Sequence, residues 1–245
     1  MKTVAIIQAR IGSTRLPGKV LLDLAGSTVL ARVVNRVRKF TLVDDVVVAT
    51  SDRGGDDLIV NECRRIDVAW FRGSEEDVLD RFAGAARSSD ASVCVRLTAD
   101  CPLLDPGVSD TIISVFLEAN GGADYASNKI PQSFPRGLDT EVFSMDALSR
   151  AARDARRRYE RAHVTPYIYR HPEMFSLISV TSDIDRADWR WTIDTAEDLD
   201  FVREIYNRLD GSQDFSWQDV LGIIENDPAL MWINSRVQQK EIAEG

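Results

Sequence analysis

Short apolar runs alternate with helical patterns along the first half of this chain. The apolar runs cover residues 4–7, 46–49, 68–71 and 93–97, and helical spacing of apolar side chains covers 27–37 (with Ser27 as N-cap), 56–65, 75–87 and 108–119. Strands that are apolar throughout and separated by helices are typical of a parallel sheet covered on both faces. The pattern therefore predicts an α/β fold whose ligands bind beyond the carboxyl ends of the strands.

The alternation becomes less regular after Asp124. Residues 128–139 are rich in Pro and Gly and indicate a functional loop inserted into the domain. Later patterns predict strands at 140–143, 175–180 and 190–193, and two amphipathic helices from Ser216 onward.

Six arginines lie between Arg150 and Arg161. Their spacing from Asp154 and Glu160 permits ion pairs along one helix. We interpret most of this run as a solvent-exposed helix rather than as an anion site.

The overall charge and the cysteines exclude several classes of protein. Thirty Lys and Arg against 39 Asp and Glu give a net charge of -9, which disfavours nucleic-acid binding. No apolar stretch approaches the length of a membrane span or a signal peptide. Cys63, Cys94 and Cys101 form no Cys-x-x-Cys pair, and we expect reduced core residues in a cytoplasmic protein. His163 and His171 are too far apart in sequence to support a histidine-based zinc site.

The first strand runs directly into a small basic loop. Within the first 22 residues the charged side chains are Lys2, Arg10, Arg15 and Lys19, although the whole chain is acidic. Small residues let backbone N–H groups approach phosphate oxygens, and Arg and Lys supply charge. The loop matches neither the Walker nor the dinucleotide-binding glycine pattern. It predicts a nucleoside triphosphate site, with an ordinary solvated loop as the alternative.

Two carboxylates follow later apolar runs. Asp100 comes after the run at 93–97 and just before Pro102, where an oxygen ligand could hold Mg²⁺ on a nucleotide; a turn or capping Asp is the alternative. Asp194 follows the run at 190–193, and its spacing to Glu197 by itself favours an N-cap. Sequence spacing does not show whether Asp100 and Asp194 meet.

Several motifs in collinear order extend from residue 3 to about residue 235 and resemble one family. They are Gln8-Ala9-Arg10, Ser13-Thr14-Arg15-Leu16-Pro17-Gly18-Lys19, Val48-Ala49-Thr50-Ser51, Arg72-Gly73-Ser74-Glu75-Glu76-Asp77-Val78-Leu79-Asp80-Arg81, Thr98-Ala99-Asp100-Cys101-Pro102-Leu103, Pro135-Arg136-Gly137-Leu138-Asp139-Thr140-Glu141, Arg161-Ala162-His163-Val164-Thr165-Pro166-Tyr167 and Arg190-Trp191-Thr192-Ile193-Asp194-Thr195. The chain resembles the sugar-acid cytidylyltransferases, in the branch called spore-coat polysaccharide biosynthesis protein F, which is related to the CMP-KDO and CMP-sialic acid synthetases.

The resemblance implies a nucleotidyltransferase fold: a Rossmann-like, mostly parallel mixed sheet flanked by helices, with a small acceptor-side or dimerisation insert at about 127–187. We expect one domain over 1–210 and a helical extension over 211–245 that packs on it. The implied partners are CTP, a sugar-type acceptor and a second copy of the chain, with Mg²⁺ as cofactor.

The resemblance also implies roles for individual residues. The catalytic set is Arg10, Lys19, Asp100 and Asp194, with Asp100 and Asp194 as metal ligands. The nucleotide-binding set is Ala9, Gly12, Ser13, Arg15, Lys19, Ser51, Asp52, Arg72 and Ser74. The acceptor-binding set is Arg136, Gly137, Asp139, Glu141 and His163. Two positions depart from the branch: Ala162 replaces a common Glu beside His163, and Ala99 replaces a common Gly.

The implied reaction is attack of an acceptor oxygen on the α-phosphorus of CTP with release of pyrophosphate, in the synthesis of a surface polysaccharide or glycoconjugate. One alternative is a glycosyltransferase with a nucleotide-sugar donor, although Thr98 replaces the first Asp of the Asp-x-Asp signature such enzymes carry. Another alternative is a non-catalytic scaffold for polysaccharide assembly.

Overall fold

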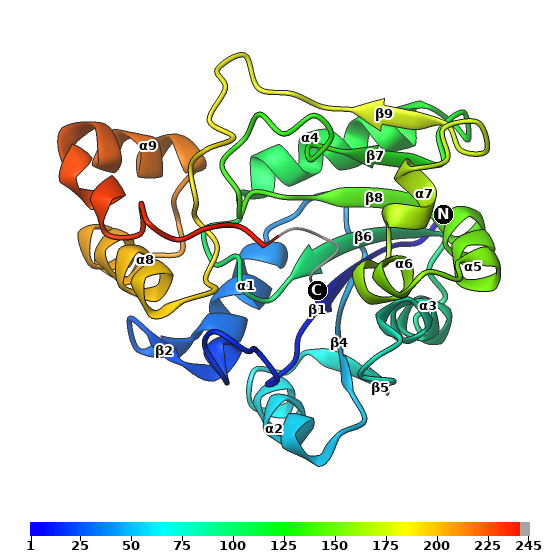
Figure 1. Ribbon diagram of the computed structural model, residues 1–245, viewed down its shortest axis with the longest axis horizontal. Coiled ribbons are helices and arrows are strands. Elements are labelled where there is room, and N and C mark those ends of the chain that lie inside the picture. The colour runs from blue at the N-terminus through cyan, green and yellow to red at the C-terminus, as the bar shows by residue number, and fades with distance from the viewer. Residues whose placement is uncertain (241–245) are drawn as a thin grey trace.

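A mixed sheet forms the centre of the molecule. The computed structural model describes residues 1–240, and within them the main sheet has seven strands in the order β5-β4-β1-β6-β8-β7-β9 (Figure 1). The strands are β1 (Thr3–Gln8), β4 (Asp45–Ser51), β5 (Ala69–Gly73), β6 (Val93–Thr98), β7 (Tyr125–Ser127), β8 (Glu141–Ser144) and β9 (Leu177–Ser179). β5, β4, β1 and β6 are parallel, whereas β8 runs antiparallel to both β6 and β7. The predicted mostly parallel mixed sheet is confirmed.

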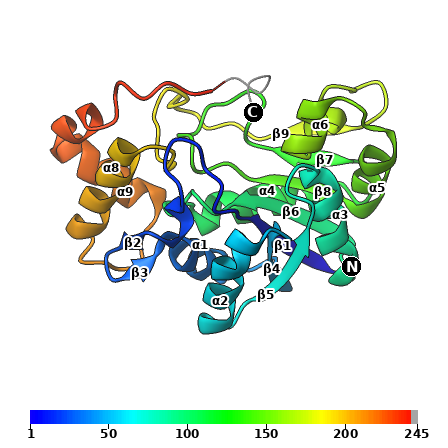
Figure 2. The same cartoon turned by 60° about the horizontal axis from the view of Figure 1, so that its bottom comes forward.

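Helices cover both faces of this sheet (Figures 1 and 2). They are α1 (Val29–Val37), α2 (Asp57–Arg65), α3 (Val78–Ser88), α4 (Pro106–Glu118), α5 (Met145–Asp154), α6 (Arg158–His163), α7 (Pro166–Tyr169), α8 (Ala196–Arg208) and α9 (Trp217–Asn226). Successive side chains of β1 point to opposite faces: Ala5 and Ile7 join the cluster with α1, α4 and α8, whereas Val4 and Ile6 join the cluster with α3 and α5. All four side chains are fully buried, as expected for a strand covered on both sides.

The first helix begins one residue later than predicted. Ser27 pairs with Leu24 in a small hairpin of β2 (Asp23–Leu24) and β3 (Ser27–Thr28). Thr28 is the N-cap instead, and its hydroxyl accepts the N–H of Ala31 at 3.0 Å.

Two predictions for the second half were wrong. Residues 190–193 form no strand; Arg190 makes one bridge with Arg136, while Trp191 and Ile193 are buried in the core without a ladder. The second terminal helix is only a 3-10 turn, Pro228–Trp232, and α9 ends before it because Pro228 lacks the N–H that would continue α9. Val220, Ile224 and Leu230 join the same core cluster as β1, and residues 241–245 of the predicted extension lie outside the described part.

The arginine run is not one solvated helix. α5 ends at Asp154 and α6 begins at Arg158, and the carboxylate of Glu160 is buried where it accepts the N–H groups of Arg156 and Arg157 at 3.1 and 3.0 Å. Arg161 pairs with Asp77 at the start of α3. Glu160 therefore caps the start of α6 and stabilises the turn that separates it from α5.

The three cysteines were expected to be unpaired core residues, and all three thiols are free and buried. Among residues 1–240, each helix is too short or too polar to cross a bilayer.

Candidate active site

The basic loop and Asp100 lie at one edge of the sheet because they follow neighbouring strands. β1 and β6 are paired so that Gln8 lies opposite Thr98, and both strands end there. The loop after β1 folds back on itself through a hydrogen bond from Gly18 N to Ile11 O of 3.0 Å. Gly18 has a φ of 70°, which favours glycine, and it leads into the 3-10 turn that begins at Lys19.

The ammonium group of Lys19 joins the two predicted metal ligands. Its Nζ donates to Asp100 Oδ2 at 2.6 Å and to Asp194 Oδ1 at 2.8 Å. A third bond, of 2.6 Å, goes to the carbonyl of Ile193. Lys19 is 8% exposed, and the two carboxylates raise its pKa although burial would lower it. The expected convergence of Asp100 and Asp194 at the basic loop is confirmed, while their role as metal ligands stays a prediction.

An irregular segment brings Asp194 to this point. Ile193 N donates to Asp100 O at 2.8 Å, which ties the segment to the end of β6. The N-cap of α8 is Thr195, so the capping role that spacing favoured for Asp194 is wrong. Thr195 and Asp198 form the capping box, which leaves the Asp194 carboxylate directed toward Lys19.

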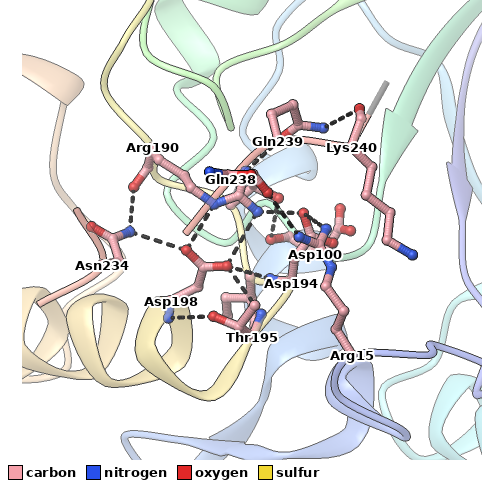
Figure 3. Close-up of polar contacts among 12 residues, drawn as sticks. Arg15, Asp100, Arg190, Asp194, Thr195, Asp198, Asn234, Gln238, Gln239 and Lys240 are labelled. Atoms are coloured by element: carbon pink, nitrogen blue, oxygen red, sulfur yellow. Dashed lines mark hydrogen bonds and ion pairs between the residues drawn. The ribbon is translucent and has the colours of Figure 1, made fainter. Parts of the chain in front are cut away.

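Two arginines complete the surroundings of Asp194 (Figure 3). Arg15 Nη2 lies 2.9 Å from Asp194 Oδ2, and Arg190 also pairs with that oxygen. Burial alone would raise the pKa of Asp194, but Lys19 and then Arg190 hold this pKa down at about 2. The carboxylate is therefore ionised throughout the physiological range.

Formal charges in this cluster cancel. The three cations are Lys19, Arg15 and Arg190, and the three carboxylates are Asp100, Asp194 and Asp198. Within residues 1–240, three or more His, Cys, Asp or Glu side chains nowhere gather as a metal site. Two carboxylates suit Mg²⁺, which is often held by one or two protein carboxylates together with substrate phosphates. The donor set thus fits a divalent ion that arrives with an anionic nucleotide.

The remaining loop residues predicted for the nucleotide are held in place by the fold. Ala9 is buried and bonded to β4 through its N–H, and the N–H of Ile11 donates to Asp56 Oδ1 at 2.8 Å. Ser13 Oγ accepts from the N–H of Leu16 at 3.4 Å. Gly12 and Arg10 face solvent. This arrangement leaves the Arg10 guanidinium exposed beside the loop.

The residues predicted for the base and ribose lie at the ends of β4 and β5. Ser51 is buried and donates to Asp56. Arg72 donates to the carbonyl of Ser51 at 2.9 Å and pairs with Asp57, so its guanidinium is already engaged. Asp52 is exposed, and Ser74 Oγ accepts the N–H of Asp77 at 3.0 Å. The structure brings this group beside the basic loop, because β4 is the other neighbour of β1.

One candidate residue in this region escaped the sequence reasoning. Arg81 on α3 is 1% exposed, and its Nη1 donates to Ser74 O at 2.6 Å. Its Nε and Nη2 find no acceptor among the residues that the structure describes. Burial, and then the charge of Arg10, lower the pKa of Arg81. Such donors need a partner from outside the chain, such as a water molecule or a ligand. The signal in the sequence was a charged residue on the otherwise apolar face of a helix.

The predicted acceptor residues spread along the inserted loop and its surroundings. Arg136 forms the bridge to Arg190, and Asp139 accepts from Gln132 Nε2 at 3.0 Å. Gly137 has a φ of 111°, and a Cβ there would lie 2.8 Å from the Trp191 backbone. His163 lies at the end of α6.

Glu141 is enclosed rather than exposed to an acceptor. Its carboxylate accepts from Tyr125 and Thr165 at 2.8 and 2.6 Å, and it pairs with Arg96 and Lys129. Burial would raise the pKa of Glu141, but the two cations lower it to about 2. Lys129, whose side chain is 31% exposed, is the member of this cluster that reaches the surface.

Comparison with known proteins identifies the family to which this chain is similar. The family model described as Cytidylyltransferase matches residues 4–219. The spore coat polysaccharide biosynthesis protein SpsF of Bacillus subtilis is 34% identical over 230 residues, which is 91% of this chain and 94% of that protein. The resemblance inferred from the motifs is confirmed.

Solved structures show the same fold. A cytidylyltransferase from Leptospira borgpetersenii serovar Hardjo-bovis superposes with a TM-score of 0.91 at 32% identity, covering 98% of this chain and all of that one. The CMP:2-keto-3-deoxy-manno-octonic acid synthetase, solved in complex with CTP, has a TM-score of 0.68 at 18% identity over 85% of this chain and all of the synthetase. The second likeness establishes the nucleotidyltransferase fold alone.

Proposed function

This chain belongs to the cytidylyltransferase family, and on that premise we propose that it transfers CMP from CTP to a sugar acid or a related sugar or polyol acceptor, with release of pyrophosphate. The observation that carries the proposal is the contact of Lys19, at the end of the basic loop, with both Asp100 and Asp194. Glycosyl transfer from a nucleotide sugar is not supported by the family match.

In the proposed mechanism the basic loop binds the triphosphate. Arg15 and Lys19 place fixed positive charge where the leaving pyrophosphate becomes more negative, and the exposed Arg10 is free to add to it. Hydrogen bonds hold the loop in shape, from Gly18 N to Ile11 O and from Ile11 N to Asp56. A loop held in this way would keep the triphosphate in line with the acceptor.

Asp100 and Asp194 would hold Mg²⁺, which when bound supplies Lewis acidity at the phosphate oxygens. Other contacts hold the two residues in place: the N–H of Ile193 donates to the backbone carbonyl of Asp100, and Arg190 pairs with the carboxylate of Asp194. Lys19 would exchange its carboxylate partners for phosphate oxygens when the nucleotide enters, which keeps its charge compensated.

Arg81 is our candidate for nucleotide recognition beside the predicted residues at the ends of β4 and β5. Its Nε and Nη2 form a fork of two donors, the shape that suits a pair of adjacent acceptor atoms. The neighbouring carbonyl of Ser74 holds the guanidinium in place.

The acceptor class is proposed from the relatives. SpsF is named for polysaccharide biosynthesis and the distant fold neighbour for a keto sugar acid. Lys129 offers a cation at the insert that such an acid could approach. We further propose a homodimer in the cytoplasm, which light scattering and fractionation would test.

Pyrophosphate detection tests the activity directly. The protein is supplied with each of four nucleoside triphosphates, Mg²⁺ and a panel of sugar acids, sugar phosphates and polyol phosphates. We expect pyrophosphate with CTP and one acceptor class, and no signal from Asp100→Asn. Asp200→Asn, an exposed acid on α8, is the matched control and should behave like the parent. Absence of pyrophosphate from the parent in every combination would refute the function, and an active Asp100→Asn would refute the site.

A further inference from the structure

The end of the described chain returns to the active site. After the 3-10 turn Pro228–Trp232 the backbone runs back toward β1 (red in Figure 1). Asn234 anchors this return: it is 4% exposed, and its Nδ2 donates to Arg190 O at 2.9 Å and to Asp198 Oδ1 at 3.1 Å. The path of the segment is therefore fixed at its start by the same network that holds Asp194.

Three consecutive residues then contact the basic loop or Arg190, and Figure 3 draws them beside Arg15 and Asp194. The carbonyl of Gln238 accepts from Arg15 Nη1 at 3.1 Å, and the side-chain oxygen of Gln239 accepts from Arg190 Nη1. Lys240 Nζ lies 3.4 Å from Thr14 Oγ1. We call residues 235–240 the terminal strap.

The strap accepts hydrogen bonds from guanidinium groups that could otherwise bind a phosphate group. Gln238 and Gln239 present neutral oxygens to the two arginines that also pair with Asp194. A phosphate oxygen is the stronger acceptor for a guanidinium because it carries charge. The contacts of Gln238 and Lys240 are solvent-exposed, so they are readily exchanged, whereas the bonds of Asn234 are buried.

We propose that the terminal strap is a displaceable cover of the nucleotide site. It lies over Arg15 when the site is free, and a polyphosphate takes Arg15 from the Gln238 carbonyl, so that the strap lifts while Asn234 stays attached. The strap thus limits the rate at which nucleotide enters. This inference rests on the proposed function.

Limited proteolysis tests the displacement. Arg236 is exposed within the strap, two residues beyond the anchor, and trypsin cleaves the bond after it more readily when residues 237–240 leave the surface. We expect CTP with Mg²⁺, and separately inorganic tripolyphosphate, to speed cleavage after Arg236 several-fold, measured by mass spectrometry. Cleavage after Arg87, an exposed arginine of α3, is the internal control. Cleavage after Arg236 that is unchanged or slowed by both ligands would overturn the proposal.

Truncation tests the effect on rates. A stop codon at position 238 removes the contacts with Arg15, Arg190 and Thr14, whereas a stop codon at 241 retains them and is the matched control. With a fluorescent CTP analogue in stopped flow, the shorter chain should bind nucleotide about fivefold faster, the effect of one lost hydrogen bond, and should release it at the rate of the control. An unchanged or slower association rate would contradict a cover.

The two experiments separate failure of the strap from failure of the function. If the full chain binds no CTP, the proposed function fails, and the tripolyphosphate arm of the proteolysis still decides whether the strap responds to phosphate. If CTP binds and turns over but neither proteolysis nor rates change, the strap proposal alone is wrong.

Discussion

Replacing Lys19 by methionine should make the carboxylate pair a better metal site in the absence of nucleotide. Lys19 Nζ lies within 2.6 and 2.8 Å of Asp100 and Asp194, so a divalent ion that entered alone would have to displace it. Methionine keeps the length and apolar stem of the side chain and removes the charge. The two carboxylates then lose their shared cation, although Arg15 and Arg190 remain on Asp194.

The size of the effect follows from the bonds that a metal ion must break. A hydrogen bond between charged partners contributes about 1.5–3 kcal/mol. Two such bonds, one to each carboxylate, set the cost of displacing Lys19 at about 3 kcal/mol or more, which is about a hundredfold in Kd. Lys19→Met should therefore bind a divalent ion about a hundredfold more tightly than the parent when nucleotide is absent.

Electron paramagnetic resonance of Mn²⁺ measures this without any turnover, because the free ion gives a signal that is lost on binding. Lys39→Met is the matched control, since Lys39 pairs with Asp214 away from the site. In the parent, CTP should tighten Mn²⁺ binding, because phosphate oxygens offer Lys19 other acceptors; in Lys19→Met, CTP itself should bind poorly. Equal Mn²⁺ affinities of Lys19→Met and parent, with the fold intact by circular dichroism, would refute the reasoning.

Three further predictions concern other parts of the site. Arg81→Met should weaken CTP binding by about ten- to a hundredfold in calorimetry, because the nucleotide then loses its hydrogen bonds to buried charged donors. Arg87→Met on the same helix should bind CTP like the parent, and an equal loss of affinity in both variants would count against Arg81. Because the pKa of Glu141 falls from its usual 4.5 to about 2 on folding, the parent should lose about 3 kcal/mol of unfolding free energy as the pH drops through that interval. Glu141→Gln should be less stable at neutral pH yet lack this loss in denaturant titrations, and an unchanged acid profile would contradict the assignment. Gly137→Ala should lower the free energy of unfolding by about 2 kcal/mol or more, because its φ of 111° and the Trp191 backbone at 2.8 Å leave no room for a methyl group; a melting temperature equal to the parent's would contradict this.

The strand ends could be predicted because they depend on local patterns. Apolar runs mark where β1 and β6 end, and the carboxyl ends of neighbouring parallel strands share one edge of the sheet. Lys19 and Asp100 were therefore expected on that edge from sequence. Motif resemblance added Asp194, because the strand predicted at 190–193, which would have placed it at a strand end, does not form.

Side-chain partners could not be predicted in the same way. The apolar face of α3 was visible, but the missing acceptors of Arg81 depend on how the segment with Ser74 packs against it. The strap has no periodicity at all, and its path depends on the buried bonds of Asn234. Such contacts between distant segments leave no regular spacing in the sequence.

The role of Asp194 depends on the N-cap of α8 lying one residue further along the chain, at Thr195. A capping pattern that began at Asp194 would have used its carboxylate on the helix, whereas the actual box joins Thr195 to Asp198. Asp198 is fully buried and accepts from the N–H of Asp194 at 2.9 Å, from Arg190 Nε at 2.9 Å and from Asn234 Nδ2 at 3.1 Å. A single structural carboxylate therefore orients the candidate metal ligand, holds the arginine beside it and anchors the strap. Because these bonds share the two oxygens of one carboxylate, a change at Asp198 should disturb the helix start, the carboxylate pair and the cover together. A change at Asp194 should leave the fold and the anchor in place.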